Sequence, residues 1–315
     1  MKSRGAAAQH RFSYAGKGFS QHENLPRPGF YNEGFPAPSY AMTSSHGPLG
    51  RPAAYPDRYD AGLLFAIPRA DNRASLGIEG VPPFAGADIW NAYELSWLDA
   101  RGKPAVAMAT LTVPADSPRI VESKSLKLYL NSFNQTRWPG PERVAEALRE
   151  DLSTATGAPT GIDLVLPARF GQRRIAELDG ICLDGLDVDI DAYAPDPGLL
   201  RCAAGDGTIG ETLMSRLLKS NCPVTGQPDW ASVQIRYTGR PLDRAALLRY
   251  LVSFRSHAEF HEHCVERLYM DIMAACRPRT LAVYARYTRR GGLDINPWRA
   301  TPGSPAPGNL STPRQ

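Results

Sequence analysis

Two short stretches, LKLYLNSF at residues 126–133 and LLRYLVSF at residues 247–254, decide the fold of this chain. They lie 121 residues apart and are identical at five of eight positions. The same offset places a segment with helical periodicity at 142–152 over a second one at 259–275. Because spacing repeats as well as residue type, the sequence predicts two tandem modules with the same architecture.

Alternating apolar residues predict strands on both sides of these helices. Residues 105–113 and 232–237 alternate before the helices, and residues 162–166 and 281–287 alternate after them. Each module is therefore expected to run strands, helix, helix, strand, which is an α+β architecture. A further helix is expected at residues 211–219.

Local signals set the helix boundaries in the second module. Asp243 is a suitable N-cap for the helix that contains residues 247–251, and Arg277 followed by a proline would end the last helix. In that helix Cys264 shares an apolar stripe with every fourth residue, so we interpret it as a packed core residue rather than a ligand.

Composition divides the chain into four parts. Residues 1–56 are rich in Gly, Pro, Ser and Tyr and are expected to form a flexible arm, followed by a first module at 57–200 and a second at 201–299. Residues 300–315 form a proline-rich tail, so the folded part is expected to end near Trp298. A chain that began at Met42 would lose no periodic segment, and we hypothesise that residues 1–41 are upstream readthrough, which peptides from before Met42 would contradict.

The overall composition is that of a globular protein of the cytoplasm. Of 315 residues, 43% are hydrophobic and 22% charged, and the net charge of +4 is spread along the chain, which argues against nucleic-acid binding. The sequence contains no apolar run long enough for a bilayer and no secretory signal. The five cysteines are widely spaced without a CxxC pair, so free thiols are expected.

The segment CPVTGQPD at residues 222–229 is expected to be a loop that brings a thiol and a carboxylate together. Cys222 could act as a nucleophile, and Asp229 could take its proton and later return one to a nitrogen anion. A cysteine and an aspartate seven residues apart also occur together by chance. The residues alone therefore leave both a catalytic and an incidental role open.

Three interpretations compete for HAEFHEH at residues 257–263, placed at a helix start. His257 and His261, four residues apart, could share a zinc ion, although the HExxH order is absent. Alternatively, His261 could carry a proton in a pocket while Glu262 accepts hydrogen bonds from a heterocycle. The third interpretation is a solvated helix start, where the helix dipole favours acidic residues.

Two further segments could hold a phosphate. ESKSLKLY at residues 122–129 begins where a strand meets a helix, so backbone N–H groups, Ser123 and Lys124 could bind an anion there. TRRGG at residues 288–292 offers Arg289 and Arg290 beside glycines that permit close approach. No GxGxxG motif follows a strand, so a Rossmann domain is not indicated.

Together these segments resemble the two-module 7-cyano-7-deazaguanine reductases, which are NADPH-dependent nitrile reductases. The resemblance rests on ESKSLKLYLNSFNQTRW, CPVTGQPDW, SFRSHAEFHEHCVER and YARYTRRGGLDINPWR, and it extends from about Asp57 to Trp298. ESKSLKLY is that family's signature for NADPH use. The resemblance implies the tunnelling fold (T-fold), an antiparallel sheet with two helices per module, and a homodimer.

The resemblance also implies a reaction: an oxidoreductase of queuosine biosynthesis converts the nitrile of 7-cyano-7-deazaguanine to an aminomethyl group. Cys222 would form a covalent thioimide with the nitrile, Asp229 would transfer a proton, and His261 would be a further proton donor that also contacts the substrate. The substrate pocket would be completed by Glu262 and by Val121, Glu122 and Ser123. The NADPH contacts would come from Ser123, Lys124, Arg290 and Gly291, and no metal ion is implied.

Two alternatives stay open. A zinc-dependent cyclohydrolase-like enzyme on the same fold would use Cys222 and the histidines as ligands, but a second cysteine ligand at suitable spacing is lacking. A non-catalytic purine-binding protein would make Cys222 and Asp229 incidental. Metal content would test the first alternative, and turnover assays would test the second.

Overall fold

The computed structural model describes residues 55–205 and 207–315. Most of the expected N-terminal arm, and with it the hypothesis about Met42, lies outside the described residues. The first half contains η1 (Ala61–Leu63), β1 (Ala66–Pro68), α1 (Ala70–Ala74), β2 (Ala85–Leu98), β3 (Pro104–Pro114), β4 (Arg119–Val121), α2 (Ser123–Ser132), α3 (Pro141–Thr156), β5 (Gly161–Val165) and η2 (Pro167–Gln172). The second half contains β6 (Ile181–Cys182), η3 (Pro197–Leu199), β7 (Ile209–Asn221), β8 (Pro228–Gly239), α4 (Arg244–Ser253), η4 (Phe254–Ser256), α5 (His261–Cys276), β9 (Thr280–Tyr287) and β10 (Leu293–Ala300).

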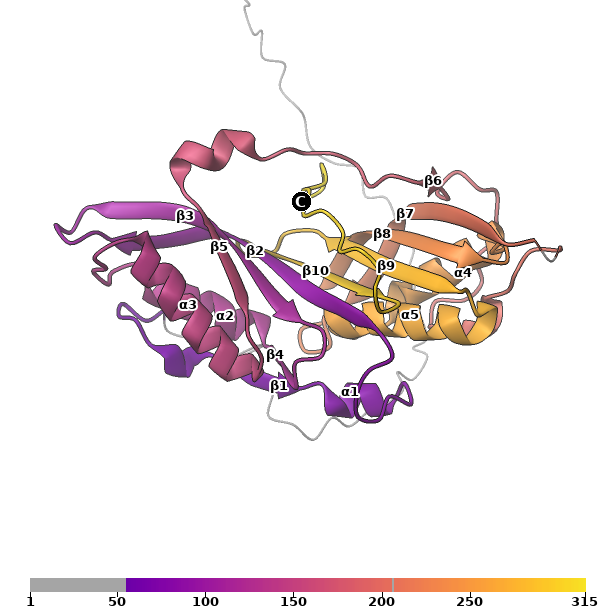
Figure 1. The fold of residues 1–315 in the computed structure, drawn as a ribbon, viewed down its shortest axis with the longest axis horizontal. Coiled ribbons are helices and arrows are strands. Elements are labelled where there is room, and N and C mark those ends of the chain that lie inside the picture. Colours follow the sequence, from indigo (N-terminus) through magenta and orange to yellow (C-terminus); the bar gives the residue numbers. More distant parts are fainter. Residues whose placement is uncertain (1–54, 206) are drawn as a thin grey trace, which may run out of the picture. The chain divides into compact units, whose positions relative to one another are not determined.

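A single sheet of eight strands runs through both halves in the order β5-β3-β2-β10-β9-β8-β7-β6, and β1 pairs with β4 separately. All neighbours in the large sheet are antiparallel except β6 and β7. The last strand, β10, pairs with β2, with Ile295 opposite Trp90, and so joins the two halves. Helices α2 and α3 lie beside β2, β3 and β5, and α4 and α5 lie beside β7–β10 (Figure 1). The predicted mixed α+β class is confirmed, and the short α1 adds a further helix to the two that were expected in the first half.

The internal repeat is confirmed in the structure of the helices. Helices α2 and α4 begin 121 residues apart, as the sequence predicts. Each has an acidic N-cap, Glu122 or Asp243, that accepts hydrogen bonds from the N–H groups two and three residues further on. Tyr129 and Tyr250 repeat at the same spacing, and each hydroxyl donates to an aspartate at 2.6 Å. The two modules therefore share capping and packing contacts as well as element order.

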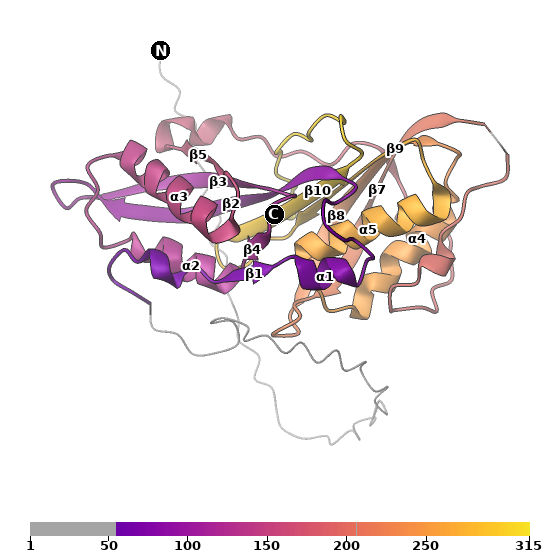
Figure 2. The same ribbon diagram turned by 60° about the horizontal axis from the view of Figure 1, so that its bottom comes forward.

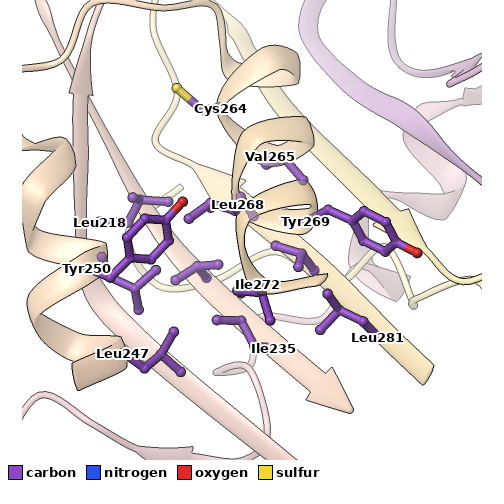
Figure 3. Packing of buried hydrophobic residues seen from close by; sticks show 14 of the residues in the cluster. Leu218, Ile235, Leu247, Tyr250, Cys264, Val265, Leu268, Tyr269, Ile272 and Leu281 are labelled. Carbon is purple, nitrogen blue, oxygen red and sulfur yellow. The ribbon is translucent and has the colours of Figure 1, made fainter. Parts of the chain in front are cut away.

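Two hydrophobic clusters, one in each half, hold the helices on the sheet. In the second cluster α5 contributes Cys264, Leu268 and Ile272, all with 0% exposed surface. All three belong to the cluster that contains Ile235 and Leu281 of the sheet, with Ile272 near these two and Cys264 farthest from them (Figure 3). Helices α4 and α5 run side by side over β7–β10 (Figure 2). Cys264 is therefore a core residue, as expected. None of the helices in the described ranges has the length and apolarity to cross a bilayer.

Residues 211–219 form a strand, and the predicted helix there is wrong. They lie within β7, which pairs with β8 along its length. Leu213, Met214 and Ser215 are buried in succession, and the register shifts between Ser215 and Leu218. Such a bulge interrupts the alternation of buried and exposed side chains along the strand. A strand rich in Leu and Met then resembles a helical pattern in the sequence.

The folded chain also does not end near Trp298. Strand β10 continues to Ala300, and the proline-rich residues 301–315 pack against the rest of the protein. Ser311 forms a β-bridge with Ile175, and Thr312 has only 2% of its surface exposed. A segment without local periodicity is ordered here by contacts with residues distant in the sequence.

Candidate active site

A tight hairpin turn between β7 and β8 positions Cys222. The Cys222 N–H donates to the Gln227 carbonyl at 2.8 Å, and the Gly226 N–H donates to the Cys222 carbonyl at 3.0 Å. Gly226 has a φ of 67°, a conformation that favours glycine. The predicted loop is confirmed for residues 222–227, whereas Asp229 lies on β8 opposite Ser220. Cys222 is buried in this turn, with 5% of its surface exposed.

The segment before α5 is hydrogen-bonded to the same hairpin. The Asn221 N–H donates to the His257 carbonyl at 2.7 Å, and the Glu259 N–H donates to the Asn221 carbonyl at 3.1 Å. These two bonds hold the start of α5, at His261, beside Cys222. Of the three interpretations of residues 257–263, the one in which His257 and His261 share a zinc ion on one helix face is contradicted, because His257 precedes the helix.

His257 instead belongs to a buried ionic group before α5. Its Nε2 lies 2.9 Å from Glu259, whose carboxylate also accepts two hydrogen bonds from Arg267 at 3.0 and 3.2 Å. Burial opposes ionisation, but these hydrogen bonds lower the pKa of Glu259 to about 2. Within residues 55–205 and 207–315, no three His, Cys, Asp or Glu side chains are grouped to hold a metal ion.

Asp229 is the centre of a polar cluster drawn from three elements. Its Oδ1 lies 3.0 Å from Arg290 Nε, which comes from the loop between β9 and β10, and 3.6 Å from His261 Nε2 of α5. The second distance is longer than a hydrogen bond. The His261 ring packs edge-on against Tyr287 of β9, with centroids 4.0 Å apart. A buried carboxylate is thus held between a guanidinium and an imidazole at the end of the sheet.

One cavity of about 330 Å³, part of which is open to solvent, brings most of the predicted site residues together. It is lined by Trp90, Ile120, Val121, Ser123, Cys222, Pro223, Asp229, Glu259, Phe260, His261, Glu262, Arg290 and Ile295. Val121 and Ser123 belong to the first half of the chain, and Cys222 and Asp229 belong to the second. The site is therefore assembled from both halves and cannot exist in either alone.

Glu262, at the second position of α5, is the most unusual acid of this cavity. Only 2% of its surface is exposed. Burial raises its pKa to about 7, and the nearby negative charge of Asp88 adds to this effect. Asp88 is itself held between the guanidinium groups of Arg69 and Arg299, the latter at 2.8 Å. Glu262 and Asp88 together line an adjoining apolar pocket of about 280 Å³, a volume that includes space open to solvent.

Glu122 has a different place from the other predicted substrate contacts. Its carboxylate caps α2, accepting hydrogen bonds from the N–H groups of Lys124 at 2.6 Å and Ser125 at 2.8 Å. It is not among the residues that line the 330 Å³ cavity. These two N–H groups are occupied, so the expectation that they could bind a phosphate is wrong.

A third cavity, of about 270 Å³, adjoins the first on the side of the β9–β10 loop. Ser123, His261 and Arg290 line both, and Lys127 lines only this one. Burial and the neighbouring charge of Arg290 lower the pKa of Lys127. Lys127 was not among the residues predicted for the site, although its position four residues after Ser123 places it on the same face of α2.

The other two predicted cofactor contacts lie at the edge of this region. Lys124 follows Ser123 on α2, and Gly291 follows Arg290 in the β9–β10 loop, but neither lines the two cavities. Gly291 has a φ of 57°, and a Cβ at this position would lie 3.1 Å from Lys127 Nζ. The loop therefore approaches α2 closely enough that a larger side chain would push against Lys127.

Comparisons with known proteins identify the family. Residues 55–164 match the model "Nitrile reductase, 7-cyano-7-deazaguanine-reductase N-term", and residues 228–305 match "QueF-like protein". The chain is 66% identical over 274 residues to the NADPH-dependent 7-cyano-7-deazaguanine reductase of Bordetella pertussis (strain Tohama I). It is 58% identical over 274 residues to the protein of the same name from Burkholderia ambifaria (strain AMMD). In both cases the match covers 87% of this chain and 100% of the relative.

A solved structure adds little to these matches. The apo form of the archaeosine synthase QueF-Like is 19% identical, with a TM-score of 0.28, and the match covers 32% of this chain and 100% of that one. The family assignment rests instead on the two family models and on the relatives that match along their whole length. This chain belongs to the family of NADPH-dependent 7-cyano-7-deazaguanine reductases.

Proposed function

We propose that this protein reduces the nitrile group of 7-cyano-7-deazaguanine to an aminomethyl group with NADPH, as a step of queuosine biosynthesis, and that Cys222 forms a covalent thioimide with the nitrile carbon. One observation carries the proposal: a single cavity collects a thiol, a buried carboxylate beside a histidine, and the second buried carboxylate of Glu262. A nucleophile with a proton carrier suits addition to a nitrile, and the second acid suits recognition of a polar heterocycle.

In the first chemical step, the Sγ of Cys222 bonds to the nitrile carbon. The thiol proton passes to the Asp229 carboxylate and from there to the nitrile nitrogen, so the adduct forms with no net gain or loss of protons. A carboxylate suits this transfer because it can accept a proton from sulfur and return it to nitrogen. Asp229 has only 3% of its surface exposed, so little water competes for the proton.

The heterocycle would be recognised at the other end of the cavity. Glu262 projects into both the main cavity and the adjoining apolar one, and the walls between them include Trp90, Ile120 and Val121. A planar base would lie between these apolar side chains while its N–H groups donate to the Glu262 carboxylate. Glu122 would contribute indirectly, since its carboxylate fixes the start of α2 next to Val121 and Ser123.

The residues beside the third cavity fit a phosphate-bearing dinucleotide. Ser123, Lys127 and Arg290 line it, so one hydroxyl group and two cationic side chains border this space. Lys124 follows Ser123 and Gly291 follows Arg290 in the chain. NADPH bound there would supply hydride, twice per nitrile, for a four-electron reduction. Arg290 would hold a phosphate while remaining close to Asp229, and His261, which lines both cavities, would deliver a further proton to the nitrogen.

We further propose that the two modules, 57–200 and 201–299, are T-fold units and that the protein acts as a homodimer. The antiparallel order of β5-β3-β2-β10-β9-β8-β7, with two helices against each half, supports the first statement. The second rests on the resemblance to the two-module reductases alone. Sedimentation equilibrium of the purified protein would test it, and a monomer at micromolar concentration would contradict it.

The proposed activity is tested by following NADPH absorbance on mixing with 7-cyano-7-deazaguanine. We expect about two NADPH oxidised for each nitrile consumed, because a nitrile takes up four electrons on reduction to an amine. Cys222→Ala should abolish turnover while leaving base binding within about tenfold, since Glu262 and the apolar walls remain. Cys182→Ser is the matched control, because Cys182 is an exposed cysteine and does not line the cavity. Turnover by the Cys222→Ala protein, or no NADPH oxidation by the wild type, would refute the proposal.

A further inference from the structure

The last residues of the chain cover the face of the sheet opposite the helices. Successive residues of a strand point to opposite faces. In β10, Leu293 and Ile295 pack in the helix-side cluster, so Asp294 and Asn296 point the other way. The segment 309–315 makes its contacts on this second face. Asn309, for example, accepts a hydrogen bond from Arg286 of β9 at 2.7 Å and donates one to Asn91 of β2 at 2.9 Å.

The Gln315 side chain uses all of its hydrogen-bonding capacity in this position. Its Oε1 accepts from Arg286 Nε at 2.8 Å and from the Thr312 N–H at 3.0 Å. Its Nε2 donates to the Tyr287 carbonyl at 2.9 Å and to Asn296 Oδ1 at 2.7 Å. An amide offers two donors and two acceptor sites, and each is paired here. Gln315 therefore ties the end of β9 to β10, on either side of the loop that connects them.

The loop at residues 288–292 is held on two sides. On the side of the site, Arg290 pairs with Asp229 at 3.0 Å, and backbone hydrogen bonds join Thr288 to Trp230 at 2.8 Å and Gly292 to Tyr93 at 2.9 Å; the anchor holds the loop from the opposite face of the sheet. Its Gly291 and Gly292 both have positive φ, a conformation that glycine adopts with little restraint. Arg289 reaches back to the anchor: its Nη2 donates to the Gln315 carbonyl at 3.1 Å, and its guanidinium lies 4.0 Å over the Tyr93 ring. The next residue, Arg290, points to the opposite side and lines both site cavities.

We propose that the segment 309–315, acting through Gln315 and Arg289, is a positioning element for the β9–β10 loop and thereby sets the affinity of the site for the phosphate groups of NADPH. The inference rests on the proposed function, which assigns Arg290 and Gly291 to that cofactor. The two adjacent arginines then have separate tasks: Arg289 fixes the loop from behind, and Arg290 faces the ligand. A loop held in its binding conformation pays less conformational entropy on binding, so the anchor strengthens cofactor binding without touching the cofactor.

The test measures NADPH binding directly, by titration of cofactor fluorescence, for Gln315→Ala. We expect its Kd for NADPH to rise about tenfold, the loss for a few poorly replaced hydrogen bonds behind a binding loop. Gln135→Ala is the matched control, because Gln135 is exposed in the turn after α2 and lines neither of the two site cavities. Its Kd should stay within about twofold of the wild type.

A second measurement separates a positioning role from general damage. The rate at which Cys222 forms its adduct with 7-cyano-7-deazaguanine without NADPH should fall much less in Gln315→Ala than the NADPH affinity does. Cys222 is held by backbone hydrogen bonds within its own turn, and only the contacts of Arg290 with Gln227 and Asp229 link that turn to the loop. An unchanged Kd for NADPH in Gln315→Ala, or equal losses of adduct formation and NADPH affinity, would overturn the inference. Absence of the adduct in the wild-type protein would instead refute the proposed function.

Arg289→Gln interrupts the same link from the side of the loop and tests it even if Gln315→Ala folds poorly. If Arg289 acts through the anchor, its variant should weaken NADPH binding to a similar degree, and the double variant should be no weaker than either single one. Additive losses in the double variant would mean that Arg289 contacts the cofactor itself, and they would overturn the assignment of Arg289 to the anchor.

Discussion

Replacing Glu262 with glutamine should make the ligand-free protein more stable above neutral pH while it destroys base binding. In the folded protein, burial and then the charge of Asp88 raise the pKa of Glu262 from 4.5 to about 7. Between these two pH values the folded state keeps a proton that the unfolded state has lost. The contribution of Glu262 to the free energy of unfolding therefore decreases as the pH rises from its unfolded to its folded pKa, because ionising the buried carboxyl group costs free energy.

The magnitude follows from the size of the pKa change. Each pH unit between the folded and unfolded values corresponds to about 1.4 kcal/mol, so the full window corresponds to about 3 kcal/mol. Glutamine has nearly the same shape and does not ionise, so Glu262→Gln removes this pH-dependent cost. The buried amide adds an offset of its own, from imperfect hydrogen bonding, but that offset is the same at every pH.

The assay is urea unfolding of both proteins at pH 4.5 and pH 8, at one protein concentration. The difference in unfolding free energy, variant minus wild type, should increase by about 3 kcal/mol from the lower to the higher pH. Glu259 and Glu266, whose pKa values are lowered to about 2, contribute stability that is lost as the pH falls, which is the opposite pH dependence to that of Glu262. Both residues are present in the two proteins, so their contribution cancels in the difference. A difference that is equal at the two pH values would refute the argument that Glu262 is a carboxyl forced towards neutrality.

Two other substitutions test the site and the core. Asp229→Asn should slow adduct formation on Cys222 by about a hundredfold or more, because the amide cannot carry the proton. Base binding should be nearly unchanged. An adduct rate equal to that of the wild type in a stopped-flow measurement would exclude this role of Asp229. Leu268→Ala should lower the free energy of unfolding by about 2–5 kcal/mol, because the Leu268 side chain of α5 is fully buried against the sheet. Activity per folded molecule should be retained. A loss below about 1 kcal/mol in urea unfolding would show that the core relaxes to fill the space left by the removed side chain.

Much of the fold was predictable because its signals are local. The repeated helix pairs follow from apolar residues spaced for one helical face, and the acidic cap at Asp243 marks the start of α4. The alternation that predicts β3, β5, β8 and β9 is equally local. Strand β7 was missed because its bulge between Ser215 and Leu218 breaks the alternation, so only pairing with β8 identifies it as a strand.

The candidate site was predictable as a set of residue types but not as a geometry. Cys222, Asp229, His261, Glu262 and Arg290 were selected as motif residues, and the structure places all five around one cavity, while their chemical roles stay predictions. The ion pair between Asp229 and Arg290 joins residues 61 positions apart and has no sequence signal. The capping role of Glu122 was equally hidden, because a glutamate before a helix can point to the helix or to a ligand.

The amino-acid sequence was enough to predict the repeated arrangement of helices and strands, the cap at Asp243 and the residue types available for chemistry. Helix, strand and capping signals depend on neighbouring residues, and the repeat is visible when two segments are compared directly. Tertiary contacts were needed to show that β10 pairs with β2, that the candidate site draws on both halves, and that Gln315 bonds to Arg286 and Arg289. These features depend on contacts between segments far apart in the chain. Their free energy comes from burial and hydrogen bonds that exist only once the sheet has assembled.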